Sequence, residues 1–251
     1  DYFSGTFGLT VTATTTEDGG DTSTTSGTLT VDGVADDPTL SASDASGTED
    51  QAIDLNITAD TTDGSETLSV SIGGIPDGAV LTSGGETITV DENVNADVSL
   101  DQLAGLQITP SADSDGDFQL TVTATSADGD DTATSTSTLD VSVAADADAP
   151  TLNLADAAGS EDTAIGLDIS SALTDTDGSE ALSVTIGDIP AGSTLTSGGQ
   201  TITVDENGNA DIDPSQLAGL QITPPDDFSG SFDLTVTSTA TEDDGGDTAT
   251  T

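Results

Sequence analysis

The strongest constraint on this chain is that it repeats itself. Six segments of its first half return in its second half, in the same order and at a nearly constant spacing of roughly 110 residues. They are PTL at 38–40 and 150–152, GTED at 47–50 with GSED at 159–162, DGSE at 63–66 and 177–180, LTSGG at 81–85 and 195–199, TITVDEN at 87–93 and 201–207, and LAGLQITP at 103–110 and 217–224. Such self-similarity is the signature of a tandem array of structural units.

A third, partial copy opens the sequence. FSGTFGLTVTAT at 3–14 parallels FSGSFDLTVTST at 228–239, and SGTLTVDGVAD at 26–36 has no counterpart after Thr251. We therefore expect three parts: residues 1–36 as the C-terminal part of a repeat, 37–148 as a complete repeat, and 149–251 as a second repeat lacking its final strand.

The same comparison of repeats leads us to expect that the sequence begins and ends within repeats of a longer array. Neighbouring chain, or a strand donated by another molecule, would then complete the end repeats, and we favour the covalent neighbour. Residues 7–14 and 28–34 should pair as strands whose apolar face is uncovered within the chain.

Within each copy the apolar residues recur at every second position. Leu68, Val70 and Ile72 alternate with serines, as Leu120 and Val122 alternate with threonines. Alternation of this kind indicates half-buried strands, and short strands bounded by Gly, Asp, Asn and Pro favour a β-sandwich. A single helical turn is predicted at 99–106 and at 213–220, where Ser or Asp can act as an N-cap.

Charge is the second constraint. The chain has no Lys, Arg or His against 48 Asp and Glu, for a formal net charge of −48. Such a balance favours disorder at low salt, but 32% hydrophobic residues in regular alternation favour a folded state once the charge is neutralised. Diffuse salt or locally bound cations could neutralise it.

Nucleic acid and anionic membrane surfaces are excluded as partners, because binding them requires cationic side chains. No apolar run is long enough for membrane insertion.

The acidic residues cluster in segments predicted to be loops. They are TTDGSE at 61–66, SADGDD at 126–131, ADADAP at 145–150, DTDGSE at 175–180 and EDDGGD at 242–247. Asp at alternate positions with Gly and a following Glu suits Ca²⁺, which takes 6–8 oxygen ligands. Zinc and softer metals prefer His or Cys, which the chain lacks. The alternative is that these are ordinary turn residues on a solvated surface.

Three of these segments resemble the motifs of cadherin repeats: LTDTDGSEALSVTI at 173–186, LTVTATSADGDD at 120–131 and DADAP at 146–150. The resemblance is closer to the cadherin-like, Ig-like tandem repeats of giant RTX-type surface adhesins, which Gram-negative bacteria release by type I secretion. It covers nearly the whole chain and implies an all-β fold, with Greek-key β-sandwich repeats strung end to end. It also implies Ca²⁺ at the joints and a location outside the cell, at the bacterial surface.

The resemblance also implies which residues hold the ions. At the joint between the two repeats they are Asp146, Asp148, Asp175, Asp177 and Glu180, with Asp243, Asp244 or Asp247 from the last loop. Glu49 resembles the cadherin glutamate that reaches the far joint. At the upstream joint they are Asp36, Asp37, Asp63, Glu66 and Asp128. Thr61 replaces an aspartate of the pattern there, so fewer or weaker ions are expected.

The function expected from these features is structural, and an enzyme is not expected. Without His, Cys, Lys or Arg, only carboxylates and hydroxyls remain for catalysis.

The leading interpretation is a calcium-rigidified stalk of a large adhesin or extracellular fibre. Its expected partners are neighbouring repeats of the same chain and other copies in a fibre, and the ligand of the adhesive tip would bind elsewhere. The alternatives are a cadherin-like module that binds cells or glycans directly, and a halophilic matrix or S-layer protein. The threonine-rich segments also admit ice binding, although outward Thr is ordinary on strands.

Overall fold

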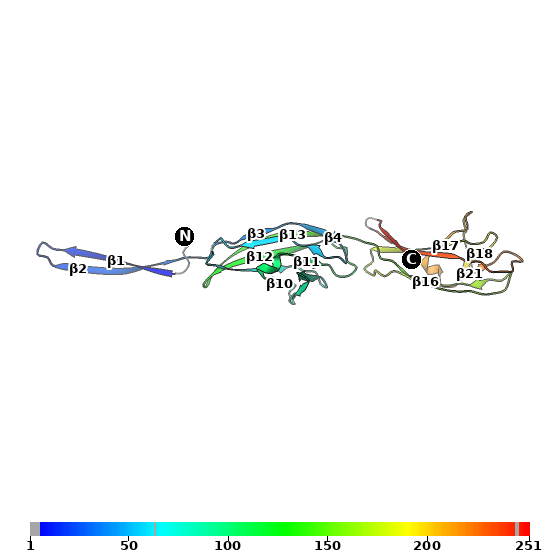
Figure 1. Ribbon diagram of the computed structural model, residues 1–251, viewed down its shortest axis with the longest axis horizontal. Coiled ribbons are helices and arrows are strands. Elements are labelled where there is room, and N and C mark those ends of the chain that lie inside the picture. Colours follow the sequence, from blue (N-terminus) through cyan, green and yellow to red (C-terminus); the bar gives the residue numbers. More distant parts are fainter. Residues whose placement is uncertain (1–5, 63, 244–245) are drawn as a thin grey trace. The chain divides into compact units, whose positions relative to one another are not determined.

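The structure is a computed structural model that describes residues 6–62, 64–243 and 246–251 (Figure 1). The fold is all-β, as predicted. The chain divides into two compact units. The first extends to Val143 except for Asp113–Asp115, and the second comprises those three residues and Ala144–Thr251.

The chain begins with a hairpin of two long strands, β1 (Thr6–Thr16) and β2 (Thr22–Asp32), blue in Figure 1. Leu9 lies opposite Leu29, and the antiparallel pairing runs along the whole length of both strands. The apolar side chains of this ribbon remain exposed, with Leu29 56% exposed to solvent. Two paired strands with uncovered apolar side chains were predicted here and are present, but residues 7–14 pair with 24–31, and the predicted strand residues 33–34 lie beyond the end of β2.

A β-sandwich makes up the rest of the first unit. Its strands are β3 (Thr39–Ala42), β4 (Ala45–Thr48), β5 (Ile53–Asp54), β6 (Ile57–Asp60), β7 (Thr67–Gly73), β8 (Val80–Ser83), β9 (Glu86–Ile88), β10 (Asn95–Val98), β11 (Leu106–Thr109), β12 (Phe118–Asp128) and β13 (Asp131–Ala144). They form a sheet in the order β10-β7-β12-β13-β4, a second sheet in the order β5-β11-β8-β9, and the pair β3-β6. The alternating residues of the sequence build the core between these sheets, with Ile72, Leu120 and Val122 fully buried.

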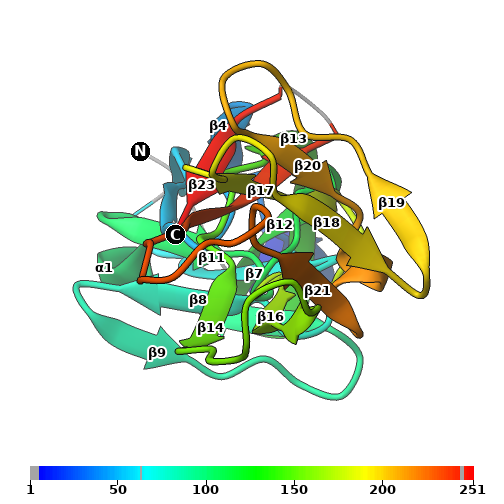
Figure 2. The ribbon, with the colours of Figure 1, turned by 90° about the vertical axis from the view of Figure 1, so that its right-hand side faces the viewer.

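The second unit repeats this plan. Its strands are β14 (Thr151–Ala155), β15 (Ile165–Gly166), β16 (Asp168–Ala172), β17 (Glu180–Gly187), β18 (Thr194–Ser197), β19 (Gln200–Ile202), β20 (Ala210–Ile212), β21 (Leu220–Thr223), β22 (Thr235–Glu242) and β23 (Thr248–Thr250). Figure 2 shows β19, β18 and β21 as neighbours, which belong to the sheet β15-β21-β18-β19. The facing sheet has the order β20-β17-β22-β23, and β14 pairs with β16.

Each unit has one short helical turn, in the place predicted for it. The α-helix α1 (Leu100–Leu103) follows Ser99, whose backbone N–H donates a hydrogen bond of 2.9 Å to the side chain of Gln102. The 3₁₀ helix η1 (Pro214–Gln216) is capped by Asp213. Within the residues described, neither turn nor any other helix has the length or apolarity to cross a membrane.

Candidate metal centre

Three carboxylates are buried together in the second unit. Asp175 lies in the loop after β16, Glu180 is the first residue of β17, and Glu242 is the last residue of β22. Only 4%, 8% and 2% of their respective surfaces are exposed, and each offers a carboxylate oxygen within 4.8 Å of the other two. We call these three residues the acidic triad.

The strand register places two members of the triad face to face. β17 and β22 are antiparallel, and Glu180 lies directly opposite Glu242. Like charges opposite one another on paired strands are destabilising, and burying an ion without a partner costs several kcal/mol. Since the chain contains no Lys, Arg or His, no side chain can neutralise them. The triad therefore requires protons or an external cation.

The segment that precedes β14 is bound to the triad through its backbone. The N–H of Asp148 donates a 2.7 Å hydrogen bond to Glu180 Oε1. Two residues later, the carbonyl oxygen of Pro150 accepts a 2.8 Å hydrogen bond from Thr251 Oγ1. The other oxygen, Glu180 Oε2, is buried and accepts no hydrogen bond from an N–H or O–H group of the described chain. An oxygen of this kind is well suited to bind a cation.

Burial raises the pKa of Glu180, and the charges of Asp175 and Asp148 add to this effect. The backbone hydrogen bond from Asp148 and the contact with the Glu242 carboxyl act in the opposite direction. The net increase means that the ionised form of Glu180 is disfavoured in this pocket unless a cation is present.

The loop sequence DTDGSE orients Asp175 by hydrogen bonds. Asp175 Oδ1 accepts from the backbone N–H of Asp177 at 2.8 Å, and Oδ2 accepts from Ser179 Oγ at 3.1 Å. The carboxylate of Asp177 in turn accepts from the N–H of Ser179 at 2.8 Å. Gly178 takes a positive φ of 100°, so the loop can turn back into β17. These contacts hold the Asp175 carboxylate beside Glu180 and Glu242, while Asp177 stays exposed.

The first unit repeats the hydrogen bonds found around the triad. The N–H of Asp36 donates a 2.6 Å hydrogen bond to Glu66 Oε1, as Asp148 does to Glu180. Ser135 Oγ donates to the carbonyl of Pro38 at 2.6 Å, as Thr251 does to Pro150. Glu66 and Asp128 are only half-buried, and Thr61 stands where the second unit has Asp175. Within the part of the chain that the structure describes, neither Glu66 nor Asp128 belongs to a group of three carboxylates close enough to share an ion.

The donor set of the triad fits a hard cation. Carboxylate oxygens, with a backbone carbonyl or water, are the ligands that Ca²⁺ takes, whereas Mg²⁺ keeps most of its own waters. The buried Glu180 Oε2 provides a ready ligand atom. Asp175, Glu180 and Glu242 would hold the ion, and its charge would offset their mutual repulsion.

The other predicted ligands take several positions. In the second unit Asp146, Asp177, Asp243 and Asp247 are exposed, and Asp148 is half-buried. In the first unit Asp36 and Asp37 are exposed, whereas Glu49 is buried. Asp63 and Asp244 lie outside the described residues. The triad unites Asp175 and Glu180, and roles for the remaining residues stay predictions.

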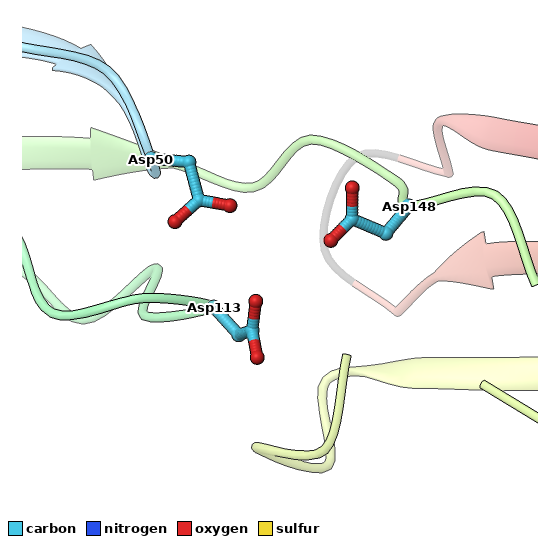
Figure 3. A group of neighbouring side chains, drawn as sticks. All are labelled: Asp50, Asp113 and Asp148. Atoms are coloured by element: carbon cyan, nitrogen blue, oxygen red, sulfur yellow. The ribbon is translucent and has the colours of Figure 1, made fainter. Parts of the chain in front are cut away.

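Sequence reasoning missed Glu242, Asp50 and Asp113. Glu242 is the repeat equivalent of Asp128, a signal that could have identified it. Figure 3 shows Asp113 and Asp148, both of the second unit, whose carboxylates offer oxygens within 4.8 Å of each other. Asp50 and Asp113 both adopt a positive φ, and so do their repeat equivalents Asp162 and Asp227. The recurrence of an aspartate at each of these two positions in both repeats was visible in the sequence.

Comparison with known proteins gives little beyond this. No protein-family model matches the chain, and no curated protein matches it. Among solved structures, Drosophila N-cadherin EC1-4 is 16% identical with a TM-score of 0.28, and the match covers 98% of this chain but only 56% of that one. Titin domains Z1Z2, solved with telethonin, are 12% identical with a TM-score of 0.30, covering 86% and 95%. The Yersinia pseudotuberculosis adhesin InvE is 11% identical with a TM-score of 0.27, covering 84% and 57%. Similarities of this size carry no argument about ligand, partner or function.

Proposed function

We propose that this chain is a calcium-rigidified structural segment, part of the stalk of a large bacterial surface adhesin or extracellular fibre. The observation that carries the proposal is the acidic triad. Three carboxylates are buried together in a chain that has no cationic side chain to neutralise them. An external cation is the simplest way to keep them ionised in the folded state at neutral pH.

The hydrogen bonds around the triad give the ion a mechanical role. Glu180 holds the backbone of Asp148, in the segment just before β14. An ion on the triad would keep Glu180 ionised and would therefore strengthen this hydrogen bond, because charged acceptors bond more strongly. The Asp36–Glu66 hydrogen bond provides the same device in the first unit. Calcium would thus restrain the segment preceding each sandwich.

The proposal includes no catalysis. The ion would be structural, the location extracellular at a bacterial surface, and the partners neighbouring repeats and other copies in a fibre. Direct adhesion to cells or glycans is the second candidate. A matrix protein that depends on diffuse salt is the third, and it differs in one measurable respect: sodium should stabilise it as well as calcium does.

The experiment is calorimetric unfolding of the full chain in millimolar CaCl₂, in chelator, and in NaCl of matched ionic strength. A site occupied at about 1,000 times its Kd adds about 4 kcal/mol to the free energy of unfolding. We expect a large rise in Tm with calcium only. Equal stabilisation by NaCl would exclude the site and favour the matrix protein.

Glu180→Gln provides a sharper signature, because it removes one of two opposed charges without changing shape. In chelator this variant should melt at a higher temperature than the wild type, since the repulsion with Glu242 is gone. In calcium it should melt at a lower one, since a ligand is gone. Glu206→Gln, at an exposed residue of the same unit, is the matched control and should leave both Tm values unchanged.

A further inference from the structure

The turn between β19 and β20 carries the one Asn-Gly pair of the sequence, Asn207–Gly208, at the end of the repeated segment TITVDEN. The chain has six asparagines, and Ile, Val, Ala or Leu follows each of the others. A side-chain amide can be attacked by the backbone nitrogen of the next residue, and glycine has no side chain to hinder this approach. The pair therefore places a reactive amide next to an unhindered backbone nitrogen.

The equivalent turn of the first unit differs in the residue that follows its asparagine. Each turn is closed by one aspartate, Asp91 or Asp205, whose carboxylate accepts two backbone N–H hydrogen bonds of 2.7–2.9 Å. The asparagine is exposed in both turns. Val94 follows it in the first unit and Gly208 in the second. The chain therefore contains a hindered and an unhindered version of one turn.

The backbone conformation at this position favours glycine. Gly208 has a φ of 81°, and a Cβ on it would lie 2.8 Å from the carbonyl oxygen of Ile189. Val94 has a φ of 59°, which is strained for a β-branched residue. The first unit accepts this strain and shields its asparagine, whereas the second unit avoids the strain and leaves Asn207 open to attack.

We propose that Asn207 is a site of spontaneous deamidation in the folded chain, and that Asn93 is not. A base from the solvent removes the proton of the Gly208 N–H, and the nitrogen attacks Cγ of Asn207. The new C–N bond closes a succinimide ring, and the side-chain amide takes up a proton and leaves as ammonia. Water then opens the ring at either carbonyl, which gives aspartate or isoaspartate.

The hydrogen bonds of the turn control the rate of this reaction. The N–H of Gly208 donates a 3.1 Å hydrogen bond to the carbonyl oxygen of Asp205, and this bond must break before the nitrogen can attack. The side-chain amide of Asn207 is held by a long hydrogen bond of 3.4 Å to Asp205 Oδ2. The reaction therefore requires local opening of an exposed turn, and the sandwich itself can stay folded.

Either product changes the second unit. Aspartate adds a negative charge beside Asp205, in a chain that has no cationic side chain to offset it. Isoaspartate also lengthens the backbone by one carbon, in a turn where the N–H groups of Asn207 and Asn209 converge on Asp205 Oδ1. Deamidation should therefore lower the stability of the second unit with time and spare the first.

The test incubates the full chain, folded in NaCl and CaCl₂, at neutral and at mildly alkaline pH. Digestion and peptide mass spectrometry then detect the gain in mass when an acid replaces the amide. We expect conversion at Asn207, faster at alkaline pH because the attacking nitrogen must lose its proton. Asn93 should react at least about tenfold more slowly, a ratio that a modest steric difference in the barrier produces. Asp205→Ala should accelerate the reaction at Asn207 about tenfold, because the turn opens more often.

Two variants provide matched controls. Val94→Gly removes the hindrance in the first unit, so Asn93 should then deamidate at a rate similar to that of Asn207. Asn207→Gln should abolish the gain in mass at its turn, because the longer side chain would have to close a larger ring. A sample of the wild type in urea reports the reaction in the unfolded chain. Asn207 that converts only in urea, Asn93 that converts as fast as Asn207 in the wild type, or Asn93 that stays intact in Val94→Gly would each overturn the proposal.

Discussion

At the scale of single residues, the two copies differ at a strained position that makes a direct prediction. Val94 adopts a φ of 59°, whereas its repeat equivalent is Gly208, with a φ of 81°. A β-branched residue is disfavoured in this left-handed region. Val94→Gly should therefore raise the free energy of unfolding. We expect a net gain of about 1 kcal/mol, because the greater flexibility of Gly in the unfolded chain offsets part of the relieved strain. Chemical denaturation of the full chain measures this change.

The reciprocal change at the same turn is the control. A Cβ at Gly208 would lie 2.8 Å from the carbonyl oxygen of Ile189, so Gly208→Val should destabilise the second unit. If both substitutions shifted stability in the same direction, the strain at this turn would not be the cause.

The aspartate of this turn provides a pH dependence. Asp205 Oδ1 accepts hydrogen bonds from the N–H of Asn209 at 2.7 Å and of Asn207 at 2.9 Å. These bonds lower the pKa of Asp205, the one from Asn209 most. A lowered folded-state pKa stabilises the fold above the unfolded-state value, and this contribution is lost as the pH falls through the folded-state value. Asp205→Ala should therefore lower Tm at neutral pH, and the difference from wild type should shrink in acid. A constant difference would contradict the titration.

Thr61 and Asp175 occupy equivalent positions in the two pockets and can be exchanged. Ca²⁺ affinity depends on the number of charged ligands, so Thr61→Asp should strengthen binding in the first unit and Asp175→Thr should weaken it in the second. We expect a change of about tenfold or more in each direction, measured by calorimetric titration of the full chain. Thr62→Asp, at the exposed neighbour, adds the same charge outside the pocket and should have little effect.

At the scale of elements, the sequence was a good guide wherever side-chain periodicity determines the structure. The alternation at Leu68, Val70 and Ile72 predicted β7, and the capping residues Ser99 and Asp213 predicted the two helical turns. These signals are local, so they are readable without knowing the tertiary fold. The uncovered β1–β2 hairpin was also predicted, because the repeat alignment shows what its equivalents pack against in a complete unit.

The candidate metal centre was only half predictable, because the strand register brings one of its three carboxylates to the other two. Asp175 and Glu180 lie in one acidic loop, whereas Glu242 joins them because β17 and β22 pair with these two glutamates opposite. A loop composition cannot reveal which residue on a distant strand faces it. Burial was equally hidden: Asp177 has the same charge as Asp175 and lies only two residues away, yet Asp175 is buried and Asp177 is exposed.

At the scale of the whole molecule, the largest electrostatic effect is the mutual repulsion within a net charge of −48, on a chain without a single basic residue. Screening by salt shortens the range of this repulsion but leaves the buried triad unneutralised, because ions at the surface screen buried charges weakly. Calcium bound as proposed would both screen the surface charges and neutralise the triad. The two effects separate in a titration: stability should rise gradually with NaCl, and it should rise steeply and then saturate with CaCl₂.

If calcium stiffens the chain, its extension in solution should depend on the ligands of the triad. Asp175→Asn together with Asp177→Asn removes two charges from the loop that orients the triad, while the apolar core of the second unit is untouched. In calcium, small-angle X-ray scattering should give a smaller maximum dimension for the double variant than for the wild type, whereas circular dichroism should report the same strand content. Glu92→Gln with Glu206→Gln removes the same charge from exposed turns and should stay as extended as the wild type. A double variant with the same maximum dimension as the wild type in calcium would show that ions at this loop do not determine the extension of the chain in solution.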